Sequence, residues 1–317
     1  MICHEGMMMS NGYDPDSEIF DVVIKTNDSF NQAPIGIPEK GSRPNFPTQI
    51  DLADSLWVGR LPSDLSREII KACWPACYPK QLEILFGQLY SFVRELPSNP
   101  PEKWDEDKRL QECVGLSKLI YPASIDFRFA ARVVREGKKL KKIIPIDDPA
   151  RGYAFVKEKR SWHTESDLHG LKELMGAWVS NSGSLSERVK RAFWFHEYAS
   201  REYYIDIRWT FIVTALEALI NTEKEQVSKQ FKERIPQLCK LLGIPELSKE
   251  EAARAYTLRS TMLHGKSINT LDSNDKELYL KIEEILRETV KQAILNQETA
   301  QIFKDAQTVK EKLPVCI

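Results

Sequence analysis

The strongest constraint on the fold is the spacing of apolar residues in the C-terminal third of the chain. Between residues 201 and 222, apolar side chains recur at steps of three and four residues, which places them on one face of an α-helix. The segment 227–242 repeats this spacing, and Gly243 follows it at the position where a glycine commonly ends a helix. A helix with one apolar face has to bury that face against another element. The first stripe consists of Ile205, Trp209, Ile212, Leu216 and Leu219.

Two capping boxes mark further helix starts, because a Ser or Thr that begins a helix often pairs with an acidic residue three positions later. Thr164 and Asp167 predict a helix that runs to about residue 179. Ser248 and Glu251 predict another helix that ends near Gly265. With an aromatic-rich helix expected over 186–200 and a last long helix from about residue 274, the sequence predicts an antiparallel bundle of four to five helices over 184–300.

The N-terminal half is less regular. Residues 1–50 are rich in Pro, Gly, Asn and Ser and predict a flexible tail, although a short strand is one interpretation of the apolar run at 17–26. A mostly helical region of unassigned role is expected over 51–180, and a second tail over 301–317. The expected fold class is therefore all-α. The helices expected in the N-terminal region cover 64–73, 79–96, 105–120 and 124–142.

Charge and apolar content exclude several classes of protein. The chain has 45 basic and 46 acidic residues, which argues against a generally basic nucleic-acid coat, so any phosphate site must be local. No apolar run approaches the roughly 20 residues that a membrane-spanning helix needs, and the N-terminus lacks the features of a signal peptide. We therefore expect a cytoplasmic protein. Cys73 and Cys77 are not accompanied by a second Cys or His pair, so we expect no metal site.

One short segment carries residues that suit phosphate chemistry. Arg259 and His264 lie five positions apart, at the point where the helix that begins at Ser248 is expected to end. An arginine offers a permanent, forked set of donors to phosphate oxygens. A histidine titrates near neutrality and can move a proton. The pair therefore suggests a site that acts on a phosphate ester.

The region around this pair resembles the HEPN superfamily, most closely its Apea-like branch, over about residues 185–297. The family motif is an Arg and a His separated by four to six residues, with a polar residue commonly after the Arg. Here those positions are Arg259, Ser260 and His264. Three stretches carry the resemblance: residues 213–219, residues 231–235 with 241–243, and residues 256–265.

The resemblance implies a function as well as a helical bundle. Many HEPN proteins are metal-independent RNA endonucleases of bacterial toxin–antitoxin or anti-phage defence systems, and they dimerise so that two motifs share one cleft. Carried onto this chain, Arg259 would stabilise the charge on the scissile phosphate and His264 would act as general acid or base. The RNA 2′-hydroxyl would be the nucleophile. Ser260 and Glu217 would support the pair, no cofactor would be needed, and the partners would be RNA, a second copy and a candidate antitoxin or other regulatory protein.

Other interpretations of these residues remain open. Arg259 and His264 can be helix C-terminal cations that stabilise the helix dipole. Glu217 can form a structural ion pair with Arg208 or Arg234, since a carboxylate in an apolar stripe needs a partner. The whole bundle can be a non-catalytic HEPN scaffold that binds RNA or a partner protein, or a nucleotide-binding module that works with a separate nucleotidyltransferase.

A basic segment lies outside the motif. Residues 131–160 contain ten Lys or Arg against four Asp or Glu. Two interpretations are equally supported: a patch that binds the RNA backbone, and a solvated helix face. The candidate RNA-binding residues are Lys138, Lys139, Lys141 and Lys142.

Overall fold

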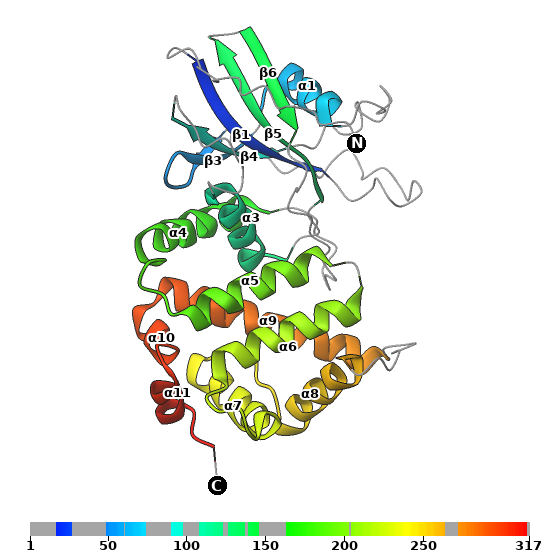
Figure 1. Cartoon of the computed structure of the whole chain (residues 1–317), viewed down its shortest axis with the longest axis vertical. Helices are drawn as coiled ribbons and strands as arrows, with labels where there is room; N and C mark the ends of the chain where they lie inside the picture. Colours follow the sequence, from blue (N-terminus) through cyan, green and yellow to red (C-terminus); the bar gives the residue numbers. More distant parts are fainter. Residues whose placement is uncertain are drawn as a thin grey trace, which may run out of the picture.

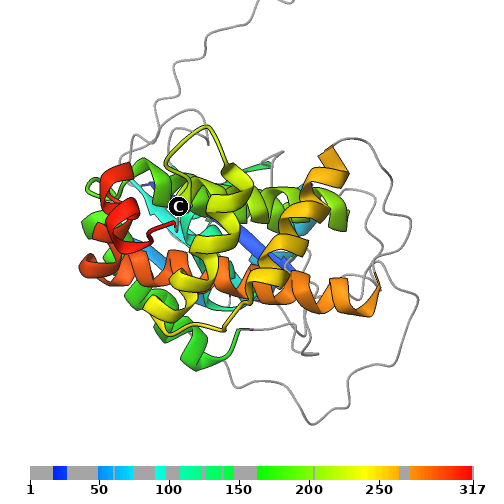
Figure 2. The ribbon, with the colours of Figure 1, turned by 90° about the horizontal axis from the view of Figure 1, so that it is seen from below.

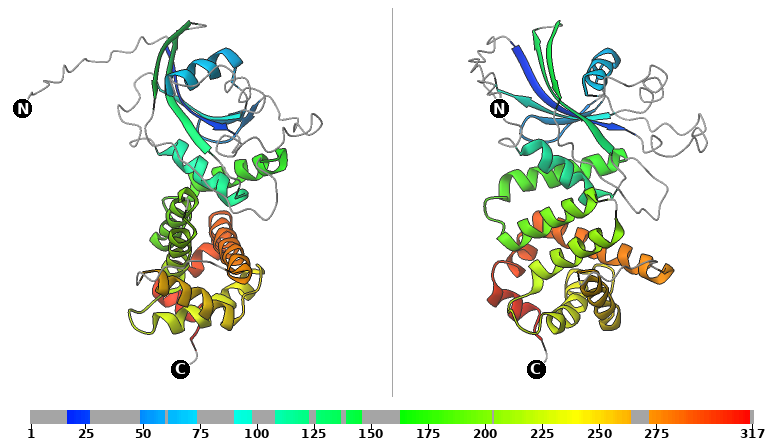
Figure 3. Two further views of the ribbon diagram at one scale, coloured as in Figure 1. Left: turned by 90° about the vertical axis from the view of Figure 1, so that its right-hand side faces the viewer. Right: turned by 45° about the vertical axis from the view of Figure 1, so that its right-hand side comes forward.

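The computed structural model of the 317-residue chain combines an antiparallel sheet with a larger helical body (Figure 1). Figure 3 shows the same division from two further sides, with helix α3 (Arg109–Ile120) between the two parts. The structure describes residues 17–26, 49–59, 61–73, 90–97, 108–122, 126–136, 139–145, 163–202, 204–263 and 272–315.

The sheet has six strands in the order β2-β3-β4-β1-β5-β6, and every neighbouring pair is antiparallel. Strand β1 lies near the middle, where Val22 pairs with Val93 of β4 on one side and with Ala131 of β5 on the other. The strands are β1 (Ser17–Thr26), β2 (Gln49–Asp51), β3 (Leu56–Gly59), β4 (Tyr90–Leu96), β5 (Asp126–Glu136) and β6 (Lys139–Pro145).

The sheet corrects the expected all-α fold class. Residues 90–96 and 126–136 were expected in helices but form interior strands, and residues 79–89 lie outside the described part. Residues 17–26 belong to the sheet and not to a tail, so the strand interpretation of this run is confirmed. Both interior strands bury side chains on two faces, and a strand that is covered on both faces loses the alternation that identifies it in sequence.

The two faces of the sheet enter different cores. Leu65, Ile69 and Ile70 of helix α1 (Ser63–Cys73) pack with Val93 and Val133 on one face. Phe92 and Ala130, each adjacent in sequence to a residue of that first core, instead join the core of the helical body. Because successive side chains of a strand point to opposite faces, the same sheet contributes side chains to both cores.

The helical body follows the sequence prediction more closely. Thr164 accepts from the Asp167 backbone N–H and Asp167 accepts from that of Thr164, which is the expected capping box at the start of α4. Gly243 ends α7 with a φ of 63°, a left-handed conformation that favours glycine. The helices are α4 (Glu165–Asn181), α5 (Glu187–Arg201), α6 (Ile205–Ile220), α7 (Val227–Leu242), α8 (Lys249–Leu263) and α9 (Ser273–Leu295).

Residues 301–315 are not a tail, which corrects this part of the prediction for 301–317, and residues 316–317 lie outside the described part. Helices α10 (Gln297–Ile302) and α11 (Ala306–Lys312) continue the fold, and Phe303, Val309 and Leu313 are buried. Leu313 also accepts a hydrogen bond from Arg234 Nε at 2.8 Å. The segment is too short and too charged to show a clear apolar stripe, which is why its sequence suggested a tail.

One hydrophobic core extends through the helical body and crosses the expected boundary at residue 180. It includes Leu116 of α3, Leu171 of α4, Phe193 of α5 and Ile285 of α9. Helix α3 lies between strands β4 and β5 in the sequence, yet it packs against α4, α5 and α9. In the described part of the chain, no helix is long and apolar enough to cross a membrane.

Candidate functional site

The candidate site lies where α8 crosses α6. Figure 2, in which the molecule is seen from below, shows α7 and α8 lying across α6 and α9. Arg259 of α8 and Glu217 of α6 meet at this crossing, with Arg259 Nη2 3.1 Å from Glu217 Oε2. Trp209 Nε1 of α6 donates to the backbone oxygen of Ala255, one turn before Arg259, at 3.0 Å, which fixes the crossing. The structure thus brings together two of the residues that the sequence singled out.

Tyr256 is a third member of this cluster, and the sequence interpretation assigned it only to packing. Its hydroxyl hydrogen-bonds the Glu217 carboxylate. Its ring lies under the Arg259 guanidinium, with Cζ 6.0 Å from the ring centroid, and packs against Phe231. Arg259 and Tyr256 lie three positions apart on one helix, a spacing that places them on the same face. That spacing was the available signal for Tyr256.

Burial and ion pairing act in opposite directions on this cluster. Burial raises the pKa of Glu217 above its usual range, while Arg259 and the Tyr256 hydroxyl limit the rise. Burial and the neighbouring Glu217 raise the pKa of Tyr256. Arg259 keeps 21% of its side chain exposed, and its Nε has no hydrogen-bond partner in the described part of the chain. The guanidinium is therefore anchored through Nη2 and remains partly exposed, whereas its Nε is buried.

The two arginines proposed as structural partners of Glu217 are engaged elsewhere. Arg208 donates to the Tyr279 hydroxyl at 3.1 Å. Arg234 donates to the backbone oxygens of Ile220 and Leu313 at 2.6 and 2.8 Å. Ser260 is half-buried on α8 and makes no side-chain hydrogen bond to described residues. His264 lies outside the described residues, so its position relative to Arg259 stays a prediction.

The basic segment is remote from this cluster. Lys139, Lys141 and Lys142 belong to β6, an edge strand of the sheet, whereas α8 lies at the opposite end of the molecule in Figure 1. Their side chains are exposed, and Lys141 pairs with Glu136 across the hairpin. Lys138 lies outside the described residues. The interpretation of this segment as a solvated helix face is therefore wrong, because these lysines lie on a strand.

A groove opens beside the cluster, between the N-terminal part of α5 and the C-terminal part of α6. Its free volume is about 480 Å³. Glu217 lines the groove and contacts Arg259, so the groove and the ion pair share one carboxylate. The spacing of residues in the sequence did not predict this groove. The side chains that matter below are Arg188, Arg191 and Phe195 of α5 and Thr214 and Glu217 of α6.

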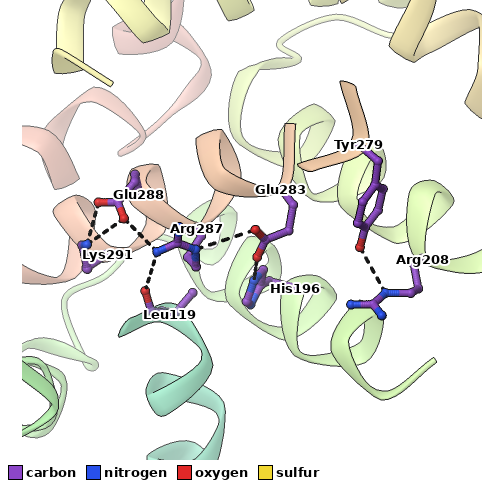
Figure 4. Close-up of polar contacts among 8 residues, drawn as sticks. All are labelled: Leu119, His196, Arg208, Tyr279, Glu283, Arg287, Glu288 and Lys291. Atoms are coloured by element: carbon purple, nitrogen blue, oxygen red, sulfur yellow. Dashed lines mark hydrogen bonds and ion pairs between the residues drawn. The ribbon is translucent and has the colours of Figure 1, made fainter. Parts of the chain in front are cut away.

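A second polar cluster lies inside the helical body (Figure 4). His196 Nε2 and Glu283 Oε1 are 3.0 Å apart, and Arg287 approaches the same carboxylate at 3.7 Å. Next to it, Lys118 of α3 pairs with Glu197 of α5 at 2.8 Å, and Arg201 pairs with Glu197 at 2.6 Å. His196, Glu197 and Lys118 are buried, so these polar groups satisfy one another inside the core. This cluster joins helices α3, α5 and α9.

The described residues contain no group of three or more His, Cys, Asp or Glu side chains placed to hold a metal ion. Comparisons with models of protein families, with curated proteins and with solved structures give no match, so the site is interpreted from its own geometry.

Proposed function

We propose that this chain is a metal-independent RNA endonuclease of the HEPN type, acting as a homodimer in a bacterial toxin or anti-phage defence setting. The observation that carries the proposal is the Glu217–Arg259 ion pair at the crossing of α6 and α8. Arg259 is the arginine of the Arg-x4-His motif, and it is held by the carboxylate that the family resemblance also implies. A guanidinium that is held by a carboxylate and is still partly exposed suits a phosphate ligand.

The proposed reaction is internal transesterification of RNA. The 2′-hydroxyl gives up its proton to a general base, and its oxygen attacks the adjacent phosphorus. The bond from phosphorus to the 5′-oxygen breaks, the leaving oxygen takes up a proton, and the products are a 2′,3′-cyclic phosphate and a 5′-hydroxyl. Arg259 stabilises the charge that develops on the phosphate oxygens. His264 transfers a proton as general acid or base.

Glu217 and Tyr256 are positioning residues in this proposal. Glu217 accepts from Arg259 and from Tyr256, so it limits the orientations of the guanidinium before a substrate arrives. A donor that is already oriented needs no reorganisation when charge develops in the transition state. The same ion pair also offsets the cost of burying the carboxylate.

Cleavage of RNA in the presence and absence of EDTA tests the proposal. We expect the wild type to cleave equally well under both conditions, Arg259→Ala to lose about 100-fold or more, and His264→Ala to lose at least as much. Glu217→Gln should lose less, since it removes a positioning residue. The products should end in a 2′,3′-cyclic phosphate.

Arg254→Ala is the matched control. Arg254 lies on the same helix and pairs with Asp275 at 2.7 Å, so its loss removes one positive charge without touching the cluster. Cleavage that Arg259→Ala and His264→Ala leave unchanged would remove the proposed site. Cleavage that disappears with EDTA would remove the metal-independent mechanism.

The ion pair itself also favours one alternative, a non-catalytic scaffold in which Arg259 only joins α6 to α8. Under this alternative, Arg259→Ala lowers thermal stability and the wild type cleaves no RNA. Under the proposal, overproduction of the wild type arrests growth and His264→Ala relieves the arrest. The two readings therefore differ in a cell-based measurement as well as in the cleavage assay.

A further inference from the structure

The groove between α5 and α6 has the dimensions and the composition of a ligand site. Its volume of about 480 Å³ falls within the range of about 300–1,000 Å³ that is usual for small-ligand pockets. Arg188, Arg191 and Phe195 lie along one face of α5, and Thr214 and Glu217 lie along the facing side of α6. The groove therefore has polar and aromatic walls, and it shares Glu217 with the proposed catalytic cluster.

The charges in the groove leave one cation available. Arg188 Nη1 donates to the backbone oxygens of Ala218 and Asn221 at 3.1 and 2.7 Å, which fixes it against the end of α6. Glu217 pairs with Arg259, and Glu187, which also lines the groove, pairs with Lys190 at 3.1 Å. Arg191 is exposed and makes no ion pair with any described residue. An anionic ligand in the groove would therefore contact Arg191, whereas Arg188 is engaged by the end of α6.

The other end of the groove is aromatic. Phe195 is half-buried and stacks on Phe211 with 6.1 Å between ring centroids, and Tyr198 contacts the same Phe211 ring. Arg191 and Phe195 are one helical turn apart, a separation of roughly 6 Å along the axis. A cationic side chain and an aromatic ring one helical turn apart suit the phosphate and the base of a nucleotide, and Glu217 links this groove to Arg259.

We propose that this groove binds the RNA nucleotide adjacent to the scissile phosphate, with its phosphate on Arg191 and its base against Phe195. The inference rests on the proposed nuclease function for its role in cleavage. Base–aromatic stacking tolerates every base, so the groove would bind the neighbouring nucleotide whatever its base.

Binding of adenosine monophosphate to the full chain tests the groove without any cleavage step. We expect saturable binding to the wild type by isothermal titration calorimetry, and about tenfold weaker binding to Phe195→Leu and to Arg191→Ala. Arg254→Ala is the control for charge, because Arg254 is an exposed cation on α8 that does not line the groove. Phe195→Tyr should bind as the wild type does. Circular dichroism melts establish that each variant is folded.

An RNA with one abasic nucleotide tests the role in cleavage. We expect an abasic residue at one of the two positions that flank the cut to slow the wild type about tenfold. The Phe195→Leu variant should cleave the normal and abasic substrates at equal rates, since it has already lost the stacking surface.

The outcomes separate the inference from the proposed function. If the wild type and Phe195→Leu are slowed equally by abasic residues, and both groove variants bind the nucleotide normally, the groove inference is wrong while the nuclease stands. If the wild type cleaves no RNA but the groove variants lose nucleotide binding, the nuclease proposal is wrong while the groove remains a nucleotide site. An acidic peptide that displaces the nucleotide at equal concentration would also overturn the inference.

Discussion

Glu217 lies in the middle of an apolar helix face, where burial of its carboxylate is unfavourable. Two neighbours on α8 offset this cost and hold the carboxylate in one orientation. A buried carboxylate without a partner is costly. Arg259 and Tyr256 supply a cation and a donor from one turn of one helix. The same few atoms therefore set both the protonation of Glu217 and the orientation of Arg259.

The raised pKa of Glu217 gives a pH-dependent contribution to stability. Its folded carboxyl holds a proton to higher pH than the unfolded carboxyl does, so this contribution is present below the unfolded pKa of about 4.5 and is lost as the pH rises through the folded pKa. We expect the stability of the wild type relative to Glu217→Gln to fall over this window. Urea denaturation at a series of pH values measures it.

Removing Arg259 should move this titration further upward, because the opposing cation is gone. Carbon-13 NMR of labelled glutamate in Arg259→Ala reads the Glu217 pKa directly, with Arg254→Ala as the control. A Glu217 titration at the same pH in both variants would contradict the assigned ion pair.

A second prediction concerns the buried pair Lys118–Glu197. Burial opposes ionisation of Glu197, yet Lys118 and Arg201 together hold the pKa of its carboxyl below the usual range. Lys118→Met should therefore lower the free energy of unfolding by about 3 kcal/mol, since one partner of a buried pair is removed. Adding Glu197→Gln should restore part of the loss.

Lys190→Met provides the comparison, because Lys190 pairs with the exposed Glu187 at 3.1 Å. A surface pair of this kind contributes about 1 kcal/mol or less. Equal losses in Lys118→Met and Lys190→Met, measured by urea denaturation, would show that the buried pair contributes no more than the surface pair.

At the scale of single residues, the sequence predicted part of the site. Arg259 and Glu217 were found because one belongs to a motif and the other interrupts an apolar stripe. The contact between them could not be predicted, because it depends on where α8 crosses α6. Arg191 and Phe195 were missed for the same reason: a groove between two helices is a property of their packing and leaves no spacing signal.

At the scale of elements, the helices of the C-terminal body were predictable and the strands were not. Capping boxes and stripes are local signals, and Thr164, Ser248 and Gly243 act as expected. Strand β5 contains Ala130, Ala131 and Arg132, whose helix propensity favours a helix. Pairing with β1 and β6 overrides that preference. The pairing with β1 joins residues far apart in sequence, so a local pattern cannot reveal it.

The contact between α3 and α5 gives an element-scale prediction. A Cβ added at Gly115 would lie 2.8 Å from Phe193 Cζ. Phe193 cannot easily move, since it packs between Trp178 and Trp194 with centroid distances of 4.8 and 4.9 Å. Gly115→Ala should therefore lower the free energy of unfolding by about 1–3 kcal/mol, despite the better helix propensity of Ala.

Gly176→Ala is the matched control for Gly115→Ala. Gly176 also lies inside a helix, α4, but no atom outside its local backbone lies within 4 Å of an added Cβ. We expect this variant to gain about 0.5–1 kcal/mol. Urea denaturation of both variants gives the comparison, and a gain in both would mean that α3 is not held tightly against α5.

At the scale of the whole molecule, the core is continuous from the sheet to the last helix. Phe92 of β4, Leu116 of α3 and Leu313 after α11 belong to one cluster. The sequence suggested separate regions and two tails. Length and composition indicate which segments are irregular, but they do not indicate which elements pack against each other. The helical body therefore begins earlier and ends later than predicted.

Deletion of residues 306–317 tests this continuity. It removes the buried side chains of Val309 and Leu313 and the acceptor of Arg234 Nε. Burying one such apolar side chain contributes about 1.5–3 kcal/mol, so the deletion should lower the free energy of unfolding by about 3 kcal/mol or more. Thermal denaturation checks it against Glu311→Ala, an exposed change on α11. A melting temperature of the deletion variant equal to that of the wild type would show that this segment behaves as a tail after all.

The path of the chain through α3 limits how the two parts can be exchanged by recombination. Helix α3 is flanked by sheet strands in the sequence, but its Lys118 completes a charge cluster of the helical body. A single crossover before α4 would import a foreign α3 together with a foreign sheet and leave Glu197 facing the wrong partner. A working chimaera needs two further crossovers besides the one before α4, one before Lys108 and one after Pro122, so that all strands of the sheet are replaced while α3 is inherited with the body.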